Sequence, residues 1–216
     1  MSWPFGPLRM FGYDVIVADP PWLFDLYSKA GEEKSAAAHY ELMTLHDIKA
    51  LPVSQLASRD CLLLLWTCGW AMATCQAHEV ARAWGFEPIT EMSWRKTTAS
   101  GAVRMGPGYR VRTMHEPILV CTTGNPRHRA LESTDRFDIC IDGLAREHSR
   151  KPVEFYEHVV DCTPNALARA DLFTRETRPG FDGWGNESTK FDRSIRRPNE
   201  TKTTTRAAAA MGNDND

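Results

Sequence analysis

The sequence predicts a single α/β domain with a mixed, mostly parallel sheet and helices on both faces of that sheet. Short apolar runs, typical of buried strands, alternate with helix-like segments between residues 13 and 190. The first run, Val15 to Val17, is β-branched throughout and is followed by Asp19-Pro20-Pro21-Trp22. Open α/β sheets bind ligands just outside the carboxyl ends of such strands, so Asp19 marks a candidate site.

The composition is that of an ordinary globular protein. The 216 residues carry a net charge of −2, so any nucleic acid would have to be bound by a local basic patch. No run of about 18 apolar residues and no signal segment is present, and we expect a cytoplasmic protein without membrane contact. The six cysteines include no C-x-x-C pair, which favours reduced thiols and predicts no metal site.

The turn after the first strand has residue types that suit chemistry on the adenine amine. Pro20 and Pro21 each lack an N–H donor, so the strand stops there. The exocyclic amine of adenine is a weak nucleophile because its lone pair is delocalised into the ring. The Asp19 carboxylate and the Pro20 carbonyl are acceptors that can bind its two N–H groups and localise that lone pair. Trp22 is expected to stack on the base, which is worth about 1–3 kcal/mol; the alternative is a plain diproline turn with Trp22 in the core.

The remaining elements follow from local patterns. Thr44, with Asp47 three residues later, predicts a capped helix that Pro52 ends. Gly85 fits the position just after a helix over residues 69–84. Further strands are predicted over residues 61–66, 87–96, 118–124, 137–141 and 167–173.

Two long loops adjoin these strands. Residues 23–39 show no clear period and are interpreted as a flap over the reacting base, with a surface insertion as the alternative. Residues 95–129 hold seven Lys or Arg residues and a single acid, Glu116. This basic stretch favours contact with phosphates, although a solvated charged loop is the other interpretation. Asp142-Gly143 is predicted to be a turn.

Lys151 stands at an electrostatically unfavourable place. Pro152 fits the first turn of a helix over residues 153–160, with Ser149 as a nearby cap. The positive end of the helix dipole then faces the lysine. A bound carboxylate would suit both the lysine and the helix, so this pattern favours a ligand over a solvent-facing lysine.

Several motifs together resemble one family. Besides Asp19-Pro20-Pro21-Trp22 they are YELMTLHDIKALP at 40–52, HSRKP at 148–152 and ADLFTRETRPGFDGWGNE at 170–187. The chain is similar to the adenine amino-methyltransferases, and among them to the family of the catalytic subunit of the mRNA adenosine methyltransferase, which has small bacterial and phage members. The resemblance covers about residues 13–190. It implies a Rossmann-like methyltransferase fold in permuted order, with the catalytic motif first and the cofactor motif last.

The resemblance also implies a role for each motif. The implied methyl donor is S-adenosyl-L-methionine and the acceptor is N6 of adenine in nucleic acid, with DNA favoured over RNA because no zinc-finger segment is visible. The expected catalytic residues are Asp19, Pro20, Pro21 and Trp22. The expected cofactor contacts are Asp19, Lys151, Asp171, Phe173, Arg175, Asn186 and Glu187. The expected substrate contacts are His39, Tyr40, Lys96, Arg104, Arg110, Arg112 and Glu116.

Two questions stay open at the level of the sequence. An RNA substrate is one alternative, and a non-catalytic nucleic-acid-binding subunit with the same fold is another, although the intact Asp-Pro-Pro-Trp favours an enzyme. Residues 1–190 are expected to form the methyltransferase domain, as a monomer or homodimer. Residues 191–216 lose the apolar pattern and are expected to be a disordered tail.

Overall fold

The computed structural model describes residues 3–23, 42–106, 110–126, 137–147 and 149–192. Within them, one sheet has the strand order β5-β3-β4-β2-β1-β6-β7. The strands are β1 Tyr13–Ala18, β2 Ala57–Trp66, β3 Glu87–Thr97, β4 His115–Thr123, β5 Cys140–Leu144, β6 Arg169–Leu172 and β7 Asp182–Trp184. The helices are α2 Leu45–Ala50, α3 Gly69–Ala73, α4 Gln76–Ala83 and α5 Val153–Cys162, with a short 3-10 helix, η2, over Val53–Gln55.

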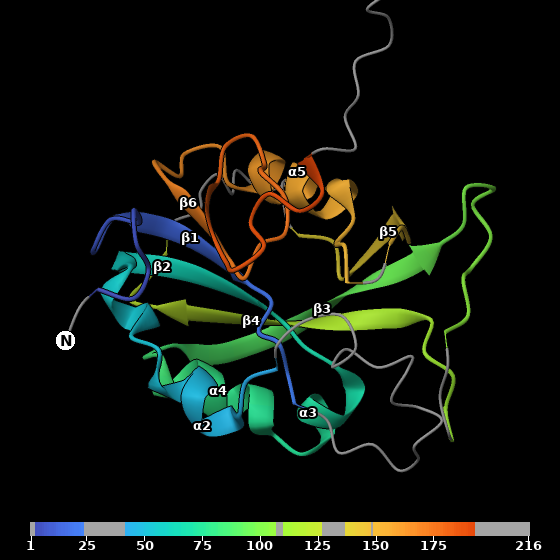
Figure 1. Cartoon of the computed structure of the whole chain (residues 1–216), viewed down its shortest axis with the longest axis horizontal. Helices are drawn as coiled ribbons and strands as arrows, with labels where there is room; N and C mark the ends of the chain where they lie inside the picture. The colour runs from blue at the N-terminus through green and yellow to red at the C-terminus, as the bar shows by residue number, and fades with distance from the viewer. Residues whose placement is uncertain (1–2, 24–41, 107–109, 127–136, 148, 193–216) are drawn as a thin grey trace, which may run out of the picture.

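The sheet is mixed and mostly parallel, which confirms the predicted fold class. The pairs β1–β2, β1–β6, β3–β5 and β6–β7 are parallel, whereas β2–β4 and β3–β4 are antiparallel. Figure 1 shows α2, α3 and α4 on one face of the sheet and α5 on the other. In the described parts of the chain, no helix is both long and apolar enough to cross a bilayer.

The two faces of the central strands build two hydrophobic cores. Alternate residues of β1 divide between them: Val15 and Val17 pack on the side of α5, and Ile16 and Ala18 pack on the side of α2 and α4. The apolar run of β2 divides in the same way. Because both faces are covered, these strands read as continuous apolar sequence, and their carboxyl ends are held rigidly side by side.

Two helix signals are confirmed and two are wrong in detail. The Thr44 side chain accepts the Asp47 N–H at 3.1 Å and caps α2. Gly85 has a φ of +82° after α4, as expected for a residue that ends a helix. The helix predicted over residues 69–84 is broken, because Cys75 has a φ of +61° between α3 and α4. Ser149 is not a cap: it lies at a φ of +64°, and α5 begins without a side-chain cap.

The predicted turn at Asp142-Gly143 is also wrong, because both residues belong to β5. Gly143 is needed there for close packing. A Cβ on it would lie 2.6 Å from the Pro152 ring and 2.8 Å from Trp94 Nε1, and the Trp94 N–H donates to the Gly143 carbonyl at 2.8 Å. The short strand β7 was not predicted, since its three residues lie in a glycine-rich stretch without an apolar pattern.

Candidate active site at the carboxyl ends of the central strands

Asp19 follows β1 directly, in the middle of the sheet. In the registers of β1, Ala18 pairs with Leu65 of β2 and with Leu172 of β6, and the Asp19 N–H donates to the Leu172 carbonyl at 3.2 Å. The sequence places the acid here because the prolines cannot continue the strand. The Pro20 carbonyl accepts the Trp22 N–H at 2.9 Å, so part of its acceptor capacity is used inside the turn.

The expected stacking of Trp22 on a base disagrees with the position of its side chain. Trp22 is 5% exposed and packs in the core on the α2 and α4 side. Its indole N–H donates to the Trp66 carbonyl at 3.1 Å. In this arrangement Trp22 fixes the turn that carries Asp19 against the end of β2, and its ring offers no open face for a base.

Asp19 belongs to a cluster of four residues of alternating charge, with Lys151, Glu116 and Lys96. The Lys151 ammonium lies 3.0 Å from Asp19 Oδ2 and 2.9 Å from Glu116 Oε2. Glu116, from β4, also lies 2.6 Å from Lys96 Nζ at the end of β3. The Lys151 ammonium stands 4.8 Å from the ring centre of the buried Trp66. Residues far apart in the sequence are thus joined in one charged cluster.

Burial and the neighbouring charges set the protonation of this cluster. Burial raises the pKa of Asp19, and the charge of Lys151 works against that rise. Burial also tends to raise the pKa of Glu116, but Lys151 and Lys96 outweigh it and lower this pKa to about 2. For Lys151, burial favours the neutral form, yet Asp19 and Glu116 outweigh burial and raise the pKa. The lysine therefore favours the ionised form of both acids.

The sequence argument about Lys151 needs one correction. A carboxylate was expected beside this lysine, and a bound ligand was expected to provide it. The structure provides two carboxylates from the chain itself, Asp19 and Glu116. The electrostatic conflict at the start of α5 is thus relieved without a ligand, although Lys151 still lines the hollow described below.

A second cluster surrounds Asp171, the third residue of β6. Its carboxylate accepts the Tyr156 hydroxyl at 3.2 Å and pairs with the Arg178 guanidinium at 3.1 Å. Glu176 joins Arg178 to Arg150, at 2.5 and 2.6 Å. Asp171 is 2% exposed, and burial raises its pKa to about 6 despite the charge of Arg178. The resemblance implies a cofactor contact here, whereas both carboxylate oxygens are bonded within the protein, to Tyr156 and to Arg178.

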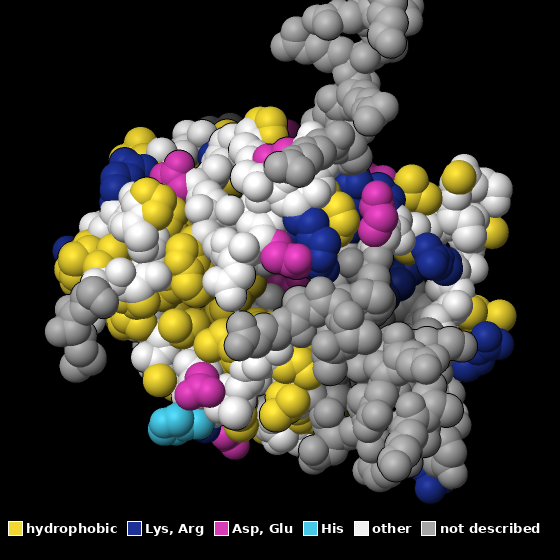
Figure 2. Space-filling model, viewed as in Figure 1, with side chains coloured by type: hydrophobic (Ala, Val, Ile, Leu, Met, Phe, Trp, Pro, Cys, Tyr) yellow, Lys and Arg dark blue, Asp and Glu magenta, His cyan; other side chains and the backbone are white. Residues whose placement is uncertain are grey.

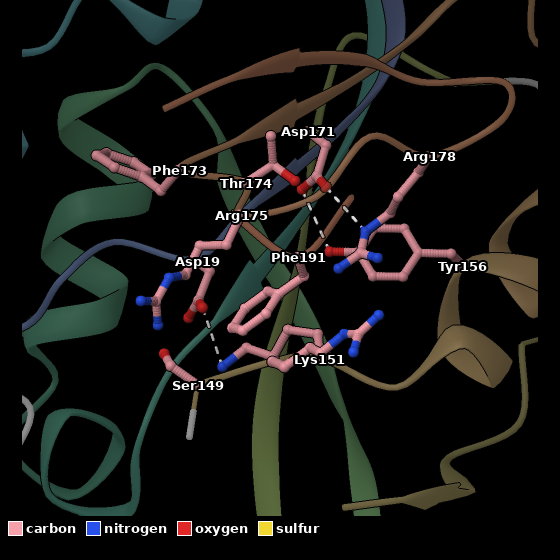
Figure 3. A pocket seen from close by; sticks show the side chains of 11 residues that line it. Asp19, Ser149, Lys151, Tyr156, Asp171, Phe173, Thr174, Arg175, Arg178 and Phe191 are labelled. Carbon is pink, nitrogen blue, oxygen red and sulfur yellow. Dashed lines mark hydrogen bonds and ion pairs between the residues drawn. The ribbon is translucent and has the colours of Figure 1, made fainter. Parts of the chain in front are cut away.

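Residues of both clusters line one hollow that is open to solvent. Figure 3 shows Asp19 and Lys151 on one side of it and Asp171, Tyr156 and Arg178 on the other. The described residues that line the hollow are Asp19, Ser149, Arg150, Lys151, Tyr156, Asp171, Phe173, Thr174, Arg175, Arg178 and Phe191. Of the expected cofactor contacts, Asp19, Lys151, Asp171, Phe173 and Arg175 are therefore brought together.

The expected contacts from the last motif lie differently. Glu187 pairs with the Arg175 guanidinium at 2.5 Å and with Lys190 at 2.7 Å, so it supports a residue of the hollow. Asn186 is exposed and is not among the residues that line the hollow. Phe173 lines the hollow and has a φ of +62°.

Phe191 is a residue of the hollow that the sequence argument missed. It stands one residue past the expected end of the domain. Its ring centre lies 4.9 Å from the Arg150 guanidinium and 5.3 Å from that of Arg175. The next residue, Asp192, accepts the Thr177 N–H at 2.8 Å and hydroxyl at 2.7 Å. The ordered unit therefore extends at least to residue 192, and the arginines at 150 and 175 were the available signal for an aromatic partner.

The expected substrate contacts are only partly gathered. Lys96 and Glu116 belong to the charged cluster with Asp19. Arg104 is exposed and donates to the Ala145 carbonyl at 2.8 Å, while Arg110 and Arg112 are exposed on the segment between β3 and β4. His39 and Tyr40 lie outside the described residues. Figure 2 shows Lys, Arg, Asp and Glu side chains close together near the middle of this face.

Comparison with known proteins identifies the family of this chain. The MT-A70 family model matches residues 13–187. The type II methyltransferase M.MunI of a Mycoplasma species is 29% identical over 200 residues, covering 85% of this chain and 81% of that protein. The mouse N(6)-adenine-specific methyltransferase METTL4 is 25% identical over 191 residues, covering 83% of this chain and 38% of METTL4. An MT-A70-like N(6)-adenosine-methyltransferase of Arabidopsis thaliana is 30% identical over 179 residues, covering 81% of this chain and 24% of that protein.

The chain thus spans most of M.MunI but well under half of the mouse and Arabidopsis relatives. The family match covers β1 with Asp19, the segment around Lys151 and the strand that carries Asp171. The match covers most of the chain, and the chain belongs to the MT-A70 family.

Proposed function

We propose that this chain transfers a methyl group from S-adenosyl-L-methionine to the N6 amine of adenine in nucleic acid, with DNA as the favoured substrate. One observation carries the proposal. In a chain of the MT-A70 family, Asp19 stands at the carboxyl end of β1 and lines a hollow that also holds Lys151 and Asp171. This is the edge of an open α/β sheet at which ligands bind.

The residues of the hollow suit the groups of this cofactor. Lys151 and Arg175 are cations that fit its carboxylate, and an ammonium has three N–H donors, of which Asp19 and Glu116 take two. Phe173 lines the hollow beside these polar residues. When bound, S-adenosyl-L-methionine supplies an electrophilic methyl carbon attached to a sulfonium.

The role of Asp19 follows from its acceptor oxygens. In the proposed reaction its carboxylate accepts one N–H of the adenine amine, and the Pro20 carbonyl accepts the other. Both acceptors draw the lone pair back to the nitrogen, which makes the amine a better nucleophile. The carboxylate also stabilises the positive charge that the nitrogen gains as the bond between the methyl carbon and sulfur breaks, and the methylated amine then releases its extra proton to water. Lys151 supports both tasks, because it favours the ionised form of Asp19. A duplex substrate has to present the base flipped out of the stack, at a cost of a few kcal/mol.

The preference for DNA rests on the extent of the matches. The chain covers 81% of M.MunI, a type II methyltransferase. It covers 48% of a Pyricularia oryzae protein named as an N6-methyladenosine RNA methyltransferase. The cytoplasm as its location and a monomer or homodimer as its assembly are part of this proposal.

The test is methyl transfer from labelled cofactor to DNA and RNA of the same sequence, followed by mass spectrometry of the nucleosides. We expect N6-methyladenine in the DNA. Asp19→Asn should abolish transfer while calorimetry still detects cofactor binding, and the exposed Asp161→Asn on α5 is the matched control. A non-catalytic subunit of the same fold predicts no labelled nucleoside in either nucleic acid. Full turnover by Asp19→Asn would disprove the role given to Asp19.

A further inference from the structure

The N-terminal residues 3–12 precede the family match, which begins at residue 13. They nevertheless pack against β7. The Trp184 indole N–H donates to the Pro4 carbonyl at 3.1 Å, and the Trp184 ring meets the Phe5 ring edge to face at 5.0 Å. Phe5 is fully buried and in turn meets the Trp3 ring at 5.3 Å. Residues 3–5 thus pack against β7, the strand at one edge of the sheet.

A second set of contacts fastens the same strand at its start. The Tyr13 hydroxyl donates to Asp182 Oδ2 at 2.9 Å, and the Arg9 guanidinium lies 3.4 Å from the same oxygen. The Arg9 guanidinium also stands over the Tyr13 ring at 5.4 Å. β7 has only three residues and lies at the edge of the sheet, so side chains from the N-terminal residues supply much of its support.

The strand β7 in turn contacts the residues that follow β6, among them Phe173, which lines the hollow. Trp184 pairs with Leu172 in the parallel register of β6 and β7, and its carbonyl accepts the Thr174 N–H at 3.0 Å. The Trp184 ring meets the Phe173 ring edge to face at 5.2 Å. Phe173 lines the hollow together with Asp19. Four aromatic rings, those of Trp3, Phe5, Trp184 and Phe173, are therefore in contact in sequence, and the last belongs to a residue that lines the proposed cofactor site.

Phe173 needs such support because its backbone is strained. Its φ of +62° lies in the left-handed region, which is unfavourable for a bulky side chain. A strained residue persists only where its surroundings determine its conformation, and such residues are found at ligand sites. The backbone close to it is tightly packed: a Cβ on Gly185 would lie 2.7 Å from the Thr174 carbonyl oxygen.

We propose that residues 3–5 form an N-terminal clamp that sets the position of Phe173 through Trp184, and so sets the affinity of the site for S-adenosyl-L-methionine. Phe5 and Trp184 are positioning residues, since they act through Phe173. The inference rests on the proposed function, because it takes the hollow to be the cofactor site. Residues 3–5 lie outside the family match.

The test compares cofactor binding in the full chain and in variants of the clamp. Phe5→Leu keeps an apolar side chain but removes the ring contact, and Trp184→Leu removes both the ring contacts and the N–H donor. We expect each to weaken calorimetric binding of S-adenosyl-L-methionine about tenfold and to raise its KM equally. The kcat and the KM for nucleic acid should stay within about twofold. Trp184→Phe keeps a ring beside Phe173 and should restore most of the affinity.

Control variants distinguish a specific loss of the clamp from general damage to the fold. Phe11→Leu changes an aromatic residue of the same N-terminal stretch that is 63% exposed, and it should bind cofactor as the unaltered chain does. Trp3→Leu, at the partly buried outer end of the clamp, gives a milder variant if Phe5→Leu does not fold. Unchanged cofactor affinity in the folded variants would overturn the clamp. A fall in kcat as large as the fall in cofactor affinity would overturn it as well. If the unaltered chain itself binds no S-adenosyl-L-methionine, the proposed function fails first.

Discussion

The charged cluster of Asp19, Lys151, Glu116 and Lys96 leads to two predicted shifts of opposite sign in the pKa of Asp19. Burial raises the pKa of Asp19, Lys151 opposes this rise and Glu116 adds to it. Lys151→Met should therefore raise the pKa of Asp19 further and move the acid limb of the pH–rate profile to higher pH. Glu116→Gln should lower the pKa of Asp19 and move that limb to lower pH. A role for these residues in folding alone predicts no such opposition.

The structure also sets the size of each effect. An opposite charge as close as Lys151 Nζ, 3.0 Å from Asp19 Oδ2, typically lowers the pKa of a carboxyl group by about 1–3. Lys151→Met should thus move the acid limb up by about 1–3 pH units. The limb should move less in Glu116→Gln, because Asp19 keeps its direct pair with Lys151. Removing Lys151 also leaves two partly buried acids without their shared partner, which should lower the free energy of unfolding.

Stability gives an independent measurement on Glu116. Its pKa falls from 4.5 to about 2 on folding, which corresponds to about 3 kcal/mol. Because the folded pKa is the lower one, this stabilisation is present above the unfolded value and is lost as the pH falls through about 4.5 toward 2. Glu116→Gln should therefore be less stable than the unaltered chain at neutral pH, and the gap should narrow in acid.

The assays are labelled methyl transfer over a pH series and urea unfolding over the same series. Glu91→Gln changes an exposed acid on β3, paired in register with Leu119 of β4, and should leave both profiles unchanged. The reasoning is refuted if the acid limb moves the same way in Lys151→Met and Glu116→Gln, or if it does not move in Lys151→Met.

Three further changes test other parts of the molecule. Trp22→Phe removes the N–H that bonds the Trp66 carbonyl and should cost about 1–3 kcal/mol of stability in urea without raising the KM for nucleic acid; a raised KM at unchanged stability would favour stacking instead. The pKa of Asp171 rises from 3.8 to about 6 on folding, so its ionisation costs stability as the pH rises through that window, by about 3 kcal/mol. Asp171→Asn should remove this slope from the unfolding profile while Arg178 keeps its pair with Glu176; an unchanged slope would contradict the burial argument. Thr44→Ala should lose about 1 kcal/mol in urea and Thr44→Ser should keep it, because only the latter retains the capping oxygen.

The parts of the fold that were predicted correctly are those that local sequence determines. The apolar run before Asp19 is a strand because β-branched residues are buried on both faces, and it ends because proline cannot continue it. Thr44 and Asp47 lie within one helical turn, so their contact depends on no other part of the chain. The family motifs added the order of catalytic and cofactor segments, which patterning alone does not supply.

The parts that were missed depend on contacts between distant residues. Nothing near Gly143 in the sequence indicates that Trp94 and Pro152 will press against it, so a glycine that permits close packing was mistaken for a turn. Trp22 was expected at the base because tryptophan suits stacking, whereas the carbonyl at the end of β2 provides a partner for its indole N–H. Phe191 follows a polar stretch, and its place in the hollow depends on two arginines far from it in the chain.

Lys151 shows how far a local electrostatic argument reaches. The sequence correctly placed a cation where the helix dipole disfavours it, and so implied a nearby carboxylate. It left open where that carboxylate comes from, and the structure provides Asp19 and Glu116. With Lys96, the cluster holds two acids and two lysines and carries no net charge. A carboxylate balanced in this way is a fixed acceptor for an amine N–H, whereas a proton on it would break the pair with Lys151. The arrangement therefore favours Asp19 as a group that orients and polarises the amine over one that stores the proton.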